Sequence, residues 1–354
     1  MYIDDYLGIA LLLDPRFPGG TSSAVAQEIQ TLHPRVRLKV HGLETRMFKG
    51  RAVNNSLAQA LNETGIELQL GGGVVRAPVV VIHNPSCLKF DQCCNHRIVC
   101  DTLIVVTHEN FTRPDGSESF DVSHCLDLIE QSTICRARRL CPVSQYNRDN
   151  VAGWVSRSGS KWKLAPFDWF NICDFDIVAP VAAPADRRGR HSRAGFEKFP
   201  PLEVMKRHFP PSATCRILGG DSFLLDPGTV PAHWDVLPFG TVPVPEFLQS
   251  IDFFVYFTHP LLRESFGRVL AEAICAGKLV ITDHDTAMNF CGAVHPSDGT
   301  DLDRIIAGYV ADPPAYQQFV EQAQKIIRRF GPDRFAETVL AGIDGIRRGD
   351  DALL

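Results

Sequence analysis

Short apolar runs that alternate with amphipathic stretches constrain the fold of this chain more than any other feature. The run YLGIALLLD at 6–14 has the continuous apolar character of a strand buried on both faces of a parallel sheet. A helical pattern follows at 23–32, with Ser22 or Ser23 as its cap. Because strand and helix go on alternating, we expect an α/β fold with helices on both faces of parallel sheets.

The same alternation runs through both halves of the chain. In the first half, we expect strands at 36–43, 77–84, 102–110 and 139–144, and helices near 52–63, 121–131 and 147–156. In the second half, we expect strands at 215–220, 235–240, 251–257 and 278–283, and helices at 264–277 and near 301–311 and 314–329. The intervening DIVAPVAAPADRRGR at 176–190 has the composition of a hinge.

Two domains are expected, because the chain's 354 residues exceed the roughly 100–200 of one typical domain. We place an N-terminal domain at 1–178 and a C-terminal domain at 179–332, both Rossmann-like. A last amphipathic stretch at 333–348 has no strand after it. We therefore predict that 333–354 form a helix that returns to the N-terminal domain.

Charge and hydropathy exclude several classes of protein. A formal charge of −5, from 36 basic and 41 acidic residues, gives no reason to expect nucleic acid as a partner. The apolar runs are shorter than the roughly 20 residues of a membrane-spanning helix, so we expect no transmembrane segment. The N-terminal MYIDDY is acidic where a secretory signal would be basic, which favours a cytoplasmic protein.

Two groups of metal-ligating residue types do not have the spacing of a metal site. The cysteine-rich segment at 87–100 does not repeat ligand pairs as zinc sites do; its candidate ligands are Cys87, Cys93, Cys94, His96 and Cys100. The eleven cysteines therefore favour reduced thiols over a metal site. The tetrad TDHD at 282–285 is more typical of a capped loop than of a metal site.

The stretch ESFGRVLAEAICAG at 264–277 carries two acidic residues on a predicted helix. Its apolar residues recur with helical spacing at Val269, Leu270, Ala273 and Ile274. Gly277 suits a left-handed C-terminal cap before the strand KLVITD. If the stretch is helical throughout, Glu264 and Glu272 lie about 12 Å apart and near one face. That distance suits a ligand that is bound lengthwise.

The start of this helix is expected to bind an anion, because backbone N–H groups and the helix dipole both favour negative charge there. Gly267 would let a diphosphate approach the main chain closely, so Ser265, Phe266 and Gly267 would cradle phosphate. One of the two glutamates would then be available for sugar hydroxyls and the other for ribose hydroxyls. The pattern indicates a nucleoside-diphosphate sugar as ligand.

Several motifs of this chain resemble those of the retaining GT-B glycosyltransferases, glycosyltransferase group 1. ESFGRVLAEAICAGKLVIT resembles the Glu-x7-Glu signature of that family, and FPGG at 17–20 resembles its Gly-Gly donor loop. THEN at 107–110 and GRHSRAGFEKFP at 189–200 resemble its first-domain histidine and its Arg…Lys phosphate clamp. The resemblance covers nearly the whole chain and implies two parallel sheets that face a central cleft, with a C-terminal return helix.

The resemblance also implies roles for the two domains and for individual residues. The N-terminal domain would bind an acceptor and the C-terminal domain a nucleotide sugar. Glu264 would contact the donor sugar, Glu272 the ribose, and His108 the sugar near the reacting carbon. Gly19 and Gly20 would contact the diphosphate and the sugar.

The phosphate clamp departs from the family pattern. The resemblance implies that Lys198 and an arginine neutralise the leaving phosphates, which is what a site without a metal requires. The gap from Arg190 to Lys198 is longer than usual, and Phe199 follows the lysine where the family usually has glycine. Either Arg190 or Arg193 therefore stays open as the clamp arginine.

Other polar features have a structural alternative. Gly219 and Gly220 in LGGDS are expected to allow close approach of the nucleotide, with a plain turn as the alternative. His83, at an earlier strand end, favours a structural or acceptor-side role. The arginine runs at 136–139 and 187–193 favour solvated faces, with an anionic membrane or acceptor as the alternative.

The resulting hypothesis is a retaining hexosyltransferase-type enzyme that moves a sugar from a nucleoside-diphosphate sugar to a saccharide or glycolipid acceptor. We expect it to act in cell-surface polysaccharide or glycoconjugate synthesis, without metal or cofactor, and peripheral contact with the inner membrane face stays open. The alternatives are a sugar-nucleotide epimerase and a non-catalytic GT-B subunit. A nicotinamide-dependent dehydrogenase fits less well, because DPRFPGGTSS rather than G-x-G-x-x-G follows the first strand.

Overall fold

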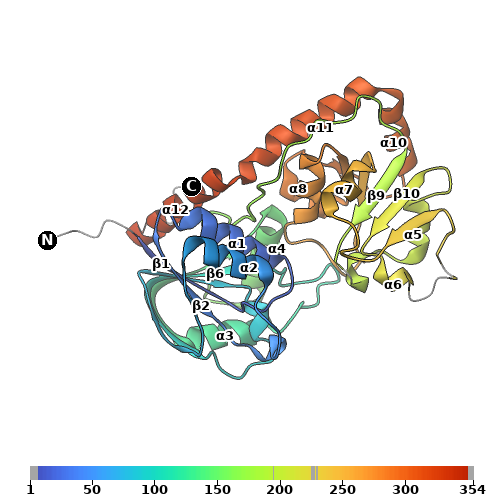
Figure 1. The fold of residues 1–354 in the computed structure, drawn as a ribbon. Coiled ribbons are helices and arrows are strands. Elements are labelled where there is room, and N and C mark those ends of the chain that lie inside the picture. The colour runs from blue at the N-terminus through green and yellow to red at the C-terminus, as the bar shows by residue number, and fades with distance from the viewer. Residues whose placement is uncertain (1–6, 194, 225–227, 229, 350–354) are drawn as a thin grey trace. The chain divides into compact units, whose positions relative to one another are not determined.

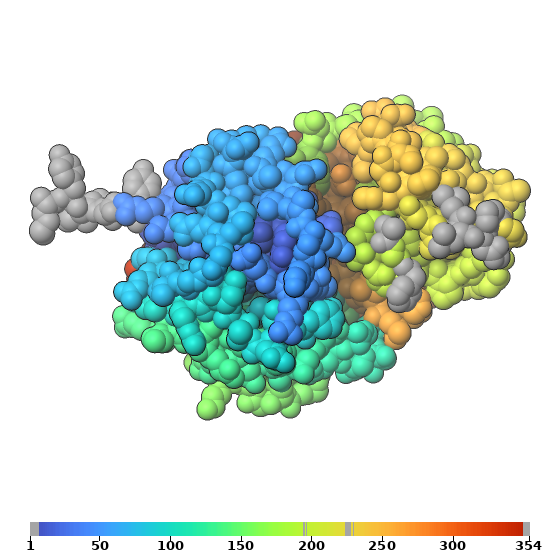
Figure 2. Space-filling model, turned by 60° about the horizontal axis from the view of Figure 1, so that its bottom comes forward, coloured from blue at the N-terminus to red at the C-terminus, as the bar shows by residue number. Residues whose placement is uncertain are grey.

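In the computed structural model the chain forms two α/β units, described for residues 7–193, 195–224, 228 and 230–349 (Figure 1). Unit 1 comprises residues 1–172 and 330–354, and unit 2 comprises residues 173–329. Figure 2 shows the blue and teal residues of unit 1 gathered in one body and the yellow residues of unit 2 in another. The expected N-terminal MYIDDY, Ala194 of the expected clamp segment and 350–354 lie outside the described residues.

The division between the units falls close to the positions that the sequence suggests. Unit 1 ends at residue 172 and resumes at 330, whereas we expected boundaries after 178 and 332. Residues 176–178 of the hinge-like segment therefore belong to unit 2, whereas we placed them in the first domain. Backbone contact explains this, since the N–H of Val178 donates to the carbonyl of Cys275 at 2.8 Å, inside unit 2.

The sheet of unit 1 consists of parallel strands in the described residues, in the order β3-β2-β1-β5-β6-β7-β8, with β4 beside β6. The strands are β1 (Gly8–Leu13), β2 (Arg37–Gly42), β3 (Leu68–Gln69), β4 (Gly73–Arg76), β5 (Val79–His83), β6 (His96–Thr107), β7 (Thr133–Pro142) and β8 (Lys163–Leu164). The central strands β1 and β5 are almost fully buried, as their continuous apolar sequence predicts.

Helices cover both faces of this sheet. They are α1 (Gly20–Leu32), α2 (Asn55–Thr64), α3 (Val122–Ser132), α4 (Gln145–Ser158) and α12 (Pro332–Arg348). Figure 1 shows α1 and α2 on one face and α3 on the other.

The C-terminal helix α12 belongs to unit 1 and packs against α1 (Figure 1). Phe335 of α12 makes edge-to-face contacts with Trp169 and Phe170. A Cβ atom added at Gly342 would lie only 2.1 Å from the ring of Phe167, so this helix approaches the segment after β8 very closely. The predicted return helix is confirmed.

The sheet of unit 2 is also parallel, in the order β11-β10-β9-β12-β13-β14. Its strands are β9 (Arg187–His191), β10 (Thr214–Leu218), β11 (Trp234–Leu237), β12 (Phe253–Tyr256), β13 (Leu279–Thr282) and β14 (His295–Pro296). The helices are α5 (Leu202–His208), α6 (Asp221–Leu224), α7 (Val244–Gln249), α8 (Arg268–Cys275), α9 (His284–Ala287), α10 (Leu302–Ala311) and α11 (Pro313–Ile327). The predicted α/β class with two parallel sheets is confirmed.

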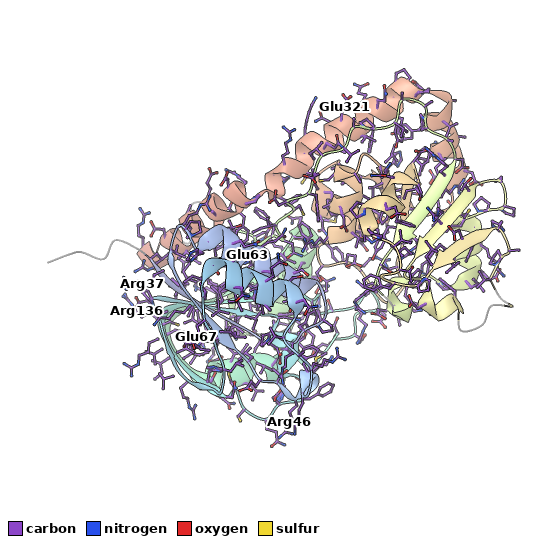
Figure 3. All side chains as sticks on the ribbon, viewed as in Figure 1. Arg37, Arg46, Glu63, Glu67, Arg136 and Glu321 are labelled. Atoms are coloured by element: carbon purple, nitrogen blue, oxygen red, sulfur yellow. The ribbon has the colours of Figure 1, made fainter. Side chains whose placement is uncertain are left out.

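The arginine run at 187–193 does not form the solvated face that we expected. Most of it is the central strand β9, in which Arg188 is 1% exposed. Its guanidinium is neutralised by Asp186 at 2.8 Å and Asp303 at 2.6 Å, which is what a buried charge requires. In the other run, Arg136 projects from the surface of unit 1 as expected (Figure 3), whereas Arg139 is buried.

In each sheet the strand order reverses once, between β1 and β5 in unit 1 and between β9 and β12 in unit 2. Ligands of open parallel sheets bind beyond the carboxyl ends of the strands at such points. Among the described residues, no helix combines the length and apolar character that a bilayer span requires. The cysteine-rich segment at 87–100 likewise forms no cluster of three metal ligands within its described part of the chain.

Candidate active site

The loop between β12 and α8 holds the first glutamate of the predicted signature. Helix α8 begins at Arg268, so Glu264 lies in the preceding loop, and the spacing of about 12 Å that we derived for an all-helical stretch does not apply. Gly267 has φ 93° and ψ 49°, a left-handed conformation that turns the chain into the helix and that glycine adopts without strain. Gly277 has φ 80° just after the helix, as predicted for its C-terminal cap.

Glu264 is held by two side chains from the same unit. Nζ of Lys198 lies 2.7 Å from its Oε1, and the hydroxyl of Tyr256 donates to the same oxygen at 2.6 Å. The side chains of Lys198 and Glu264 are 16% and 14% exposed. Burial raises the pKa of Glu264, but the Lys198 ammonium and the two hydrogen bonds outweigh it and lower the pKa below its usual value. Glu264 is therefore a carboxylate that accepts hydrogen bonds.

Arg190, one of the two clamp candidates, is fully buried at the end of β9. Its guanidinium donates to the backbone carbonyls of Phe257, at 2.6 Å, and Lys198, and it lies 4.3 Å and 4.8 Å from the ring centroids of Phe199 and Tyr256. Burial lowers its pKa to about 10. In this structure Arg190 thus holds the Lys198 loop in place, and its guanidinium has no exposed surface to offer a phosphate.

Arg193, the other candidate, has an exposed guanidinium. Its side chain is 53% exposed and donates to Oε1 of Glu197 at 2.8 Å. It follows β9 on the same loop as Lys198, at the carboxyl end of the strand. Of the two arginines, Arg193 is the one that a ligand in solution can reach.

Glu272 lies about one turn into α8 and is 27% exposed, with its Oε2 3.5 Å from Nε2 of His191 at the end of β9. Burial raises the pKa of Glu272, and Arg268 lowers it in part. Burial, with the nearby charge of Arg190, lowers the pKa of His191 to about 3, so His191 is neutral. Glu272 therefore faces the same strand end that carries the clamp loop.

Ser265 and Phe266 both precede Gly267, which turns the chain into α8, and they lie in different environments. Ser265 is partly exposed, whereas Phe266 is 2% exposed and packs edge-to-face on Phe290. The Phe266 side chain is therefore part of the core, and only its backbone remains for contact with a phosphate.

Gly219 and Gly220 serve the packing of unit 2. A Cβ atom at Gly219 would lie 1.8 Å from the carbonyl oxygen of Ser192, and Gly219 has φ 88°. A Cβ atom at Gly220 would lie 2.6 Å from the side chain of Val236. Close packing within unit 2 therefore accounts for both glycines, and their contact with a nucleotide stays a prediction.

In unit 1, Gly19 and Gly20 form the start of α1 at the carboxyl end of β1. Gly19 is the N-cap residue in an extended conformation, so the expected cap at Ser22 or Ser23 is wrong. The hydroxyl of Ser22 donates instead to the carbonyl of Phe17 at 2.8 Å. A Cβ atom at Gly20 would meet no atom within 4 Å, so the start of this helix borders open space.

His108 follows β6 directly and is half-buried. Its Nε2 lies 3.0 Å from Nδ1 of His83, the last residue of β5, and Nε2 of His83 lies 3.3 Å from Oε2 of Glu28 on α1. His83 and Glu28 are 1% and 0% exposed. The structural role that we favoured for His83 is thus a contact with His108.

The structure brings some predicted site residues together and adds others. Lys198 and Glu264 are in contact, and Arg190 holds the backbone of Lys198. The sequence analysis missed Tyr256, which ends β12 and contacts Glu264, and His191, which ends β9 directly after Arg190. It also missed Glu28, because nothing in the sequence marks a glutamate within an apolar helix face.

Comparisons with known proteins identify the fold. No protein-family model and no curated protein sequence matches this chain. Solved structures do, and Alr3699/HepE of Anabaena in complex with UDP and glucose matches with a TM-score of 0.65 at 15% identity, over 96% of this chain and 100% of its own.

Two further glycosyltransferases match over nearly their whole length. An alpha-glucosyltransferase in complex with UDP-glucose and DNA containing an abasic site has a TM-score of 0.57 at 9% identity, with 97% of this chain and 99% of its own covered. The E. coli trehalose-6-phosphate synthase bound with UDP-2-fluoro glucose has a TM-score of 0.57 at 11% identity, with 98% and 99% covered. This chain is similar to all three in fold, and that fold is the GT-B fold of glycosyltransferases.

Proposed function

We propose that this protein transfers a sugar from a UDP-sugar to an acceptor hydroxyl with retention of anomeric configuration. The contact of Glu264 with Lys198, next to the start of α8, carries the proposal. An ionised carboxylate can accept hydrogen bonds from the hydroxyls of a sugar, while an adjacent ammonium can balance the charge of a diphosphate. The structural neighbours that hold UDP or UDP-glucose support UDP as the nucleotide.

The diphosphate would lie at the start of α8. The first turn of a helix leaves backbone N–H groups without intrahelical partners, and the left-handed Gly267 removes side-chain bulk there. Lys198 and the exposed Arg193 would supply positive charge, with the backbone of Ser265 and Phe266 beside them. Glu272 would accept hydrogen bonds from the ribose hydroxyls.

Bond cleavage would be assisted electrostatically. As the bond between sugar and diphosphate breaks, negative charge develops on the leaving oxygen, where Lys198, Arg193 and the helix start stabilise it. The acceptor hydroxyl attacks the face that the diphosphate leaves, and the departing phosphate takes its proton. Unit 1, with Gly19, Gly20 and His108 at the carboxyl ends of its strands, would bind the acceptor.

The acceptor class in this proposal is a saccharide or glycolipid, in polysaccharide or glycoconjugate synthesis at the inner face of a membrane. The site that we describe needs neither a metal nor a cofactor for this chemistry, since cationic side chains take the place of a metal. The test therefore measures binding of the nucleotide-sugar donor first, because most of the residues described above would contact the donor.

The test is a ligand-binding and transfer experiment. UDP and UDP-glucose are expected to raise the melting temperature, by contrast with GDP and ADP, because a ligand that binds only the folded state stabilises it. Glu272→Ala should weaken UDP binding, and Glu264→Gln should abolish sugar transfer while UDP still binds. Glu203→Gln, on the exposed surface of α5, is the matched control and should change neither.

Three results would count against the proposal. The first is that no nucleotide or nucleotide sugar stabilises the protein. The second is that UDP affinity is unchanged in Glu272→Ala. The third is a product with inverted anomeric configuration, or an epimerised donor without transfer, as NMR of the isolated products would show.

A further inference from the structure

Three side chains of unit 1 form a row that ends at His108. Glu28 comes from α1, His83 from the end of β5, and His108 from the residue after β6. Oε2 of Glu28 lies 3.3 Å from Nε2 of His83, and Nδ1 of His83 lies 3.0 Å from Nε2 of His108. We refer to these three residues as the relay.

The inner members of the relay depend on one another for hydrogen bonding. Glu28 is 0% exposed and His83 is 1% exposed. Among the described residues, Nε2 of His83 has no hydrogen bond elsewhere, and Glu28 has the indole N–H of Trp169 as its further polar neighbour. Because a buried polar group without a partner is costly, the 3.3 Å contact is where both groups can be satisfied.

The ligand atoms of the relay lie within 4.8 Å of one another, a spacing at which the three residues could together hold a metal ion. His83 faces His108 with one ring nitrogen and Glu28 with the other. A metal ion on either ring nitrogen of His83 would replace the contact which that nitrogen makes in this structure. In such a row, the position of the proton on one side chain fixes which ring nitrogen of the next side chain carries a proton.

We propose that Glu28 and His83 are positioning residues that decide which ring nitrogen of His108 carries a proton. When Glu28 is a neutral carboxyl, it donates to Nε2 of His83, Nδ1–H of His83 donates to Nε2 of His108, and Nδ1 of His108 carries the proton. When Glu28 is ionised, Nε2–H of His83 donates to the carboxylate, and Nε2–H of His108 donates to Nδ1 of His83. Nδ1 of His108 is then an acceptor.

The two arrangements differ by one proton. Going from the first to the second, Glu28 passes its proton to Nε2 of His83, and Nδ1 of His83 passes one to Nε2 of His108. Nδ1 of His108 releases one to solvent. Both imidazoles are neutral before and after, and the only new charge is on the carboxylate.

The surroundings favour the first arrangement near neutral pH. Burial raises the pKa of Glu28 to about 8, although the indole of Trp169 lowers it in part. Burial also lowers the pKa of His83 well below its ordinary value and that of His108 to about 3, so both rings are neutral. The titratable groups that face Glu28 are His83 of β5 and the buried thiol of Cys141 on β7, and burial keeps that thiol protonated by raising its pKa.

The inference rests on the proposed function for one point only, which is that His108 meets the donor sugar. With the relay in its first arrangement, His108 offers an N–H donor to a sugar hydroxyl. Above a pH of about 8 it would offer an acceptor instead. The relay thus links the chemistry at the carboxyl end of β6 to a carboxyl group in the core of the unit.

The experiment is NMR of the whole protein with ¹⁵N-labelled histidine and no ligand, in which ring nitrogen shifts report the tautomer. His108→Gln assigns the signal of His108. The wild-type protein is expected to show Nδ1–H on His108 at about pH 6–7 and Nε2–H at about pH 9. In Glu28→Gln the amide donates in place of the neutral carboxyl, so Nδ1–H is expected at every pH in that range.

A second variant and an internal control keep the test decisive. His83→Phe should give His108 a mixture of tautomers at about pH 7, and His96, which is buried elsewhere in the unit, should be unchanged in Glu28→Gln. A His108 tautomer that is the same in wild type and His83→Phe would overturn the proposal, as would a pH response that survives in Glu28→Gln.

Activity separates this inference from the proposed function. If the protein transfers sugar, wild-type KM for the donor should rise at least several-fold between about pH 7 and about pH 9, and Glu28→Gln should lack that rise. If the NMR results are as expected and no transfer occurs, the relay stands and the proposed function fails. If transfer occurs and the tautomer does not respond, the relay fails alone.

Discussion

At the scale of single residues, the contact of Lys198 with Glu264 is the feature on which the proposed site depends most. Both side chains are mostly buried, and the carboxylate has the Tyr256 hydroxyl as a further donor. The buried carboxylate of Glu264 is stable only while Lys198 and Tyr256 contact it, because water cannot fully replace these partners. The same pair of residues therefore contributes both to the stability of the fold and to the proposed reaction.

Lys198→Met is expected to lower the free energy of unfolding by about 1–3 kcal/mol, because it leaves Glu264 buried without its counter-charge. Urea denaturation measures the change, and the double variant with Glu264→Gln should recover part of it. Lys206→Met is the control, since its partner Glu203 is 75% exposed and the pair should contribute little. Purely additive effects of the Lys198 and Glu264 changes would contradict a coupled pair.

Glu28 makes folding depend on pH in a way that Glu28→Gln should remove. Burial raises its pKa from 4.5 to about 8, so the folded protein keeps a proton that the unfolded chain releases between these values. Relative to Glu28→Gln, the wild type should lose about 3–5 kcal/mol of stability as the pH rises from about 4.5 to about 8, and no more beyond. Equal pH profiles of the two proteins in urea denaturation would show that Glu28 is not buried as an acid.

At the scale of elements, short glycine contacts decide how closely strands and helices approach. Gly219 lies against the carbonyl of Ser192, so the chain after β10 touches the chain after β9. Gly342 lies against Phe167, so α12 touches the segment after β8. Each contact is a close approach that a methyl group would block.

Gly219→Ala is expected to destabilise the protein by about 3 kcal/mol or more, since the new Cβ would meet a backbone oxygen that cannot turn away. Gly240→Ala is the matched control. Gly240 also has a positive φ, of 80°, but a Cβ there would meet nothing within 4 Å, so only about 1–2 kcal/mol of conformational cost is expected. Similar losses for both variants would mean that the backbone contact is unimportant.

Substitution by alanine should change the stability of the protein in opposite directions at two glycines of α12. Gly342→Ala is expected to cost about 1–3 kcal/mol, because Cβ would overlap the Phe167 ring. Gly345→Ala should stabilise the protein by roughly 0.5–1 kcal/mol, since alanine favours a helix and its Cβ would meet nothing within 4 Å. Thermal unfolding of both variants checks the pair, and stabilisation by Gly342→Ala would contradict the close packing of this helix.

The sequence predicts the buried strands and long helices well, because hydrophobic burial alone produces their patterns. It does not predict β9, whose Arg188 and Arg190 look solvated until Asp186, Asp303 and two backbone carbonyls are placed around them. Asp303 and Phe257 lie far along the chain and leave no local signal, and the nearby Asp186 and Lys198 do not by themselves mark a buried strand. For the same reason Arg190 was not expected to be buried.

The candidate site is predictable only in part. Glu264, Gly267 and Lys198 are found by motif, and the structure brings Glu264 and Lys198 into contact. The partnership of Glu264 with Tyr256, and of His108 with His83 and Glu28, depends on which strands are neighbours. Strand order is a property of the whole sheet, which no single stretch of sequence reveals.

At the scale of the whole molecule, unit 2 is an uninterrupted stretch of chain inserted between the two parts of unit 1. The second part contributes Phe330 and Phe335, which pack on Trp169 and Phe170. Unit 1 therefore completes its core with residues from the far end of the sequence.

A chain that ends at Arg329 is expected to lose the structure of unit 1 while keeping that of unit 2. Removal of α12 exposes the apolar face formed by Trp169 and Phe170, and loss of one buried aromatic alone costs about 3–5 kcal/mol. Hydrogen exchange by mass spectrometry should show faster exchange in β1 and β5 and unchanged exchange in β9 and β12. Full protection of β1 in the shortened chain would show that unit 1 does not need α12.

The late position of α12 has a consequence during translation. The ribosome makes every strand of the first sheet before it makes unit 2, and it makes the helix that completes unit 1 only after the whole of unit 2. Nascent unit 1 must therefore persist with an uncovered apolar face for the time that about 160 residues take to be synthesised. That face is the surface of nascent unit 1 that a nascent-chain chaperone would cover.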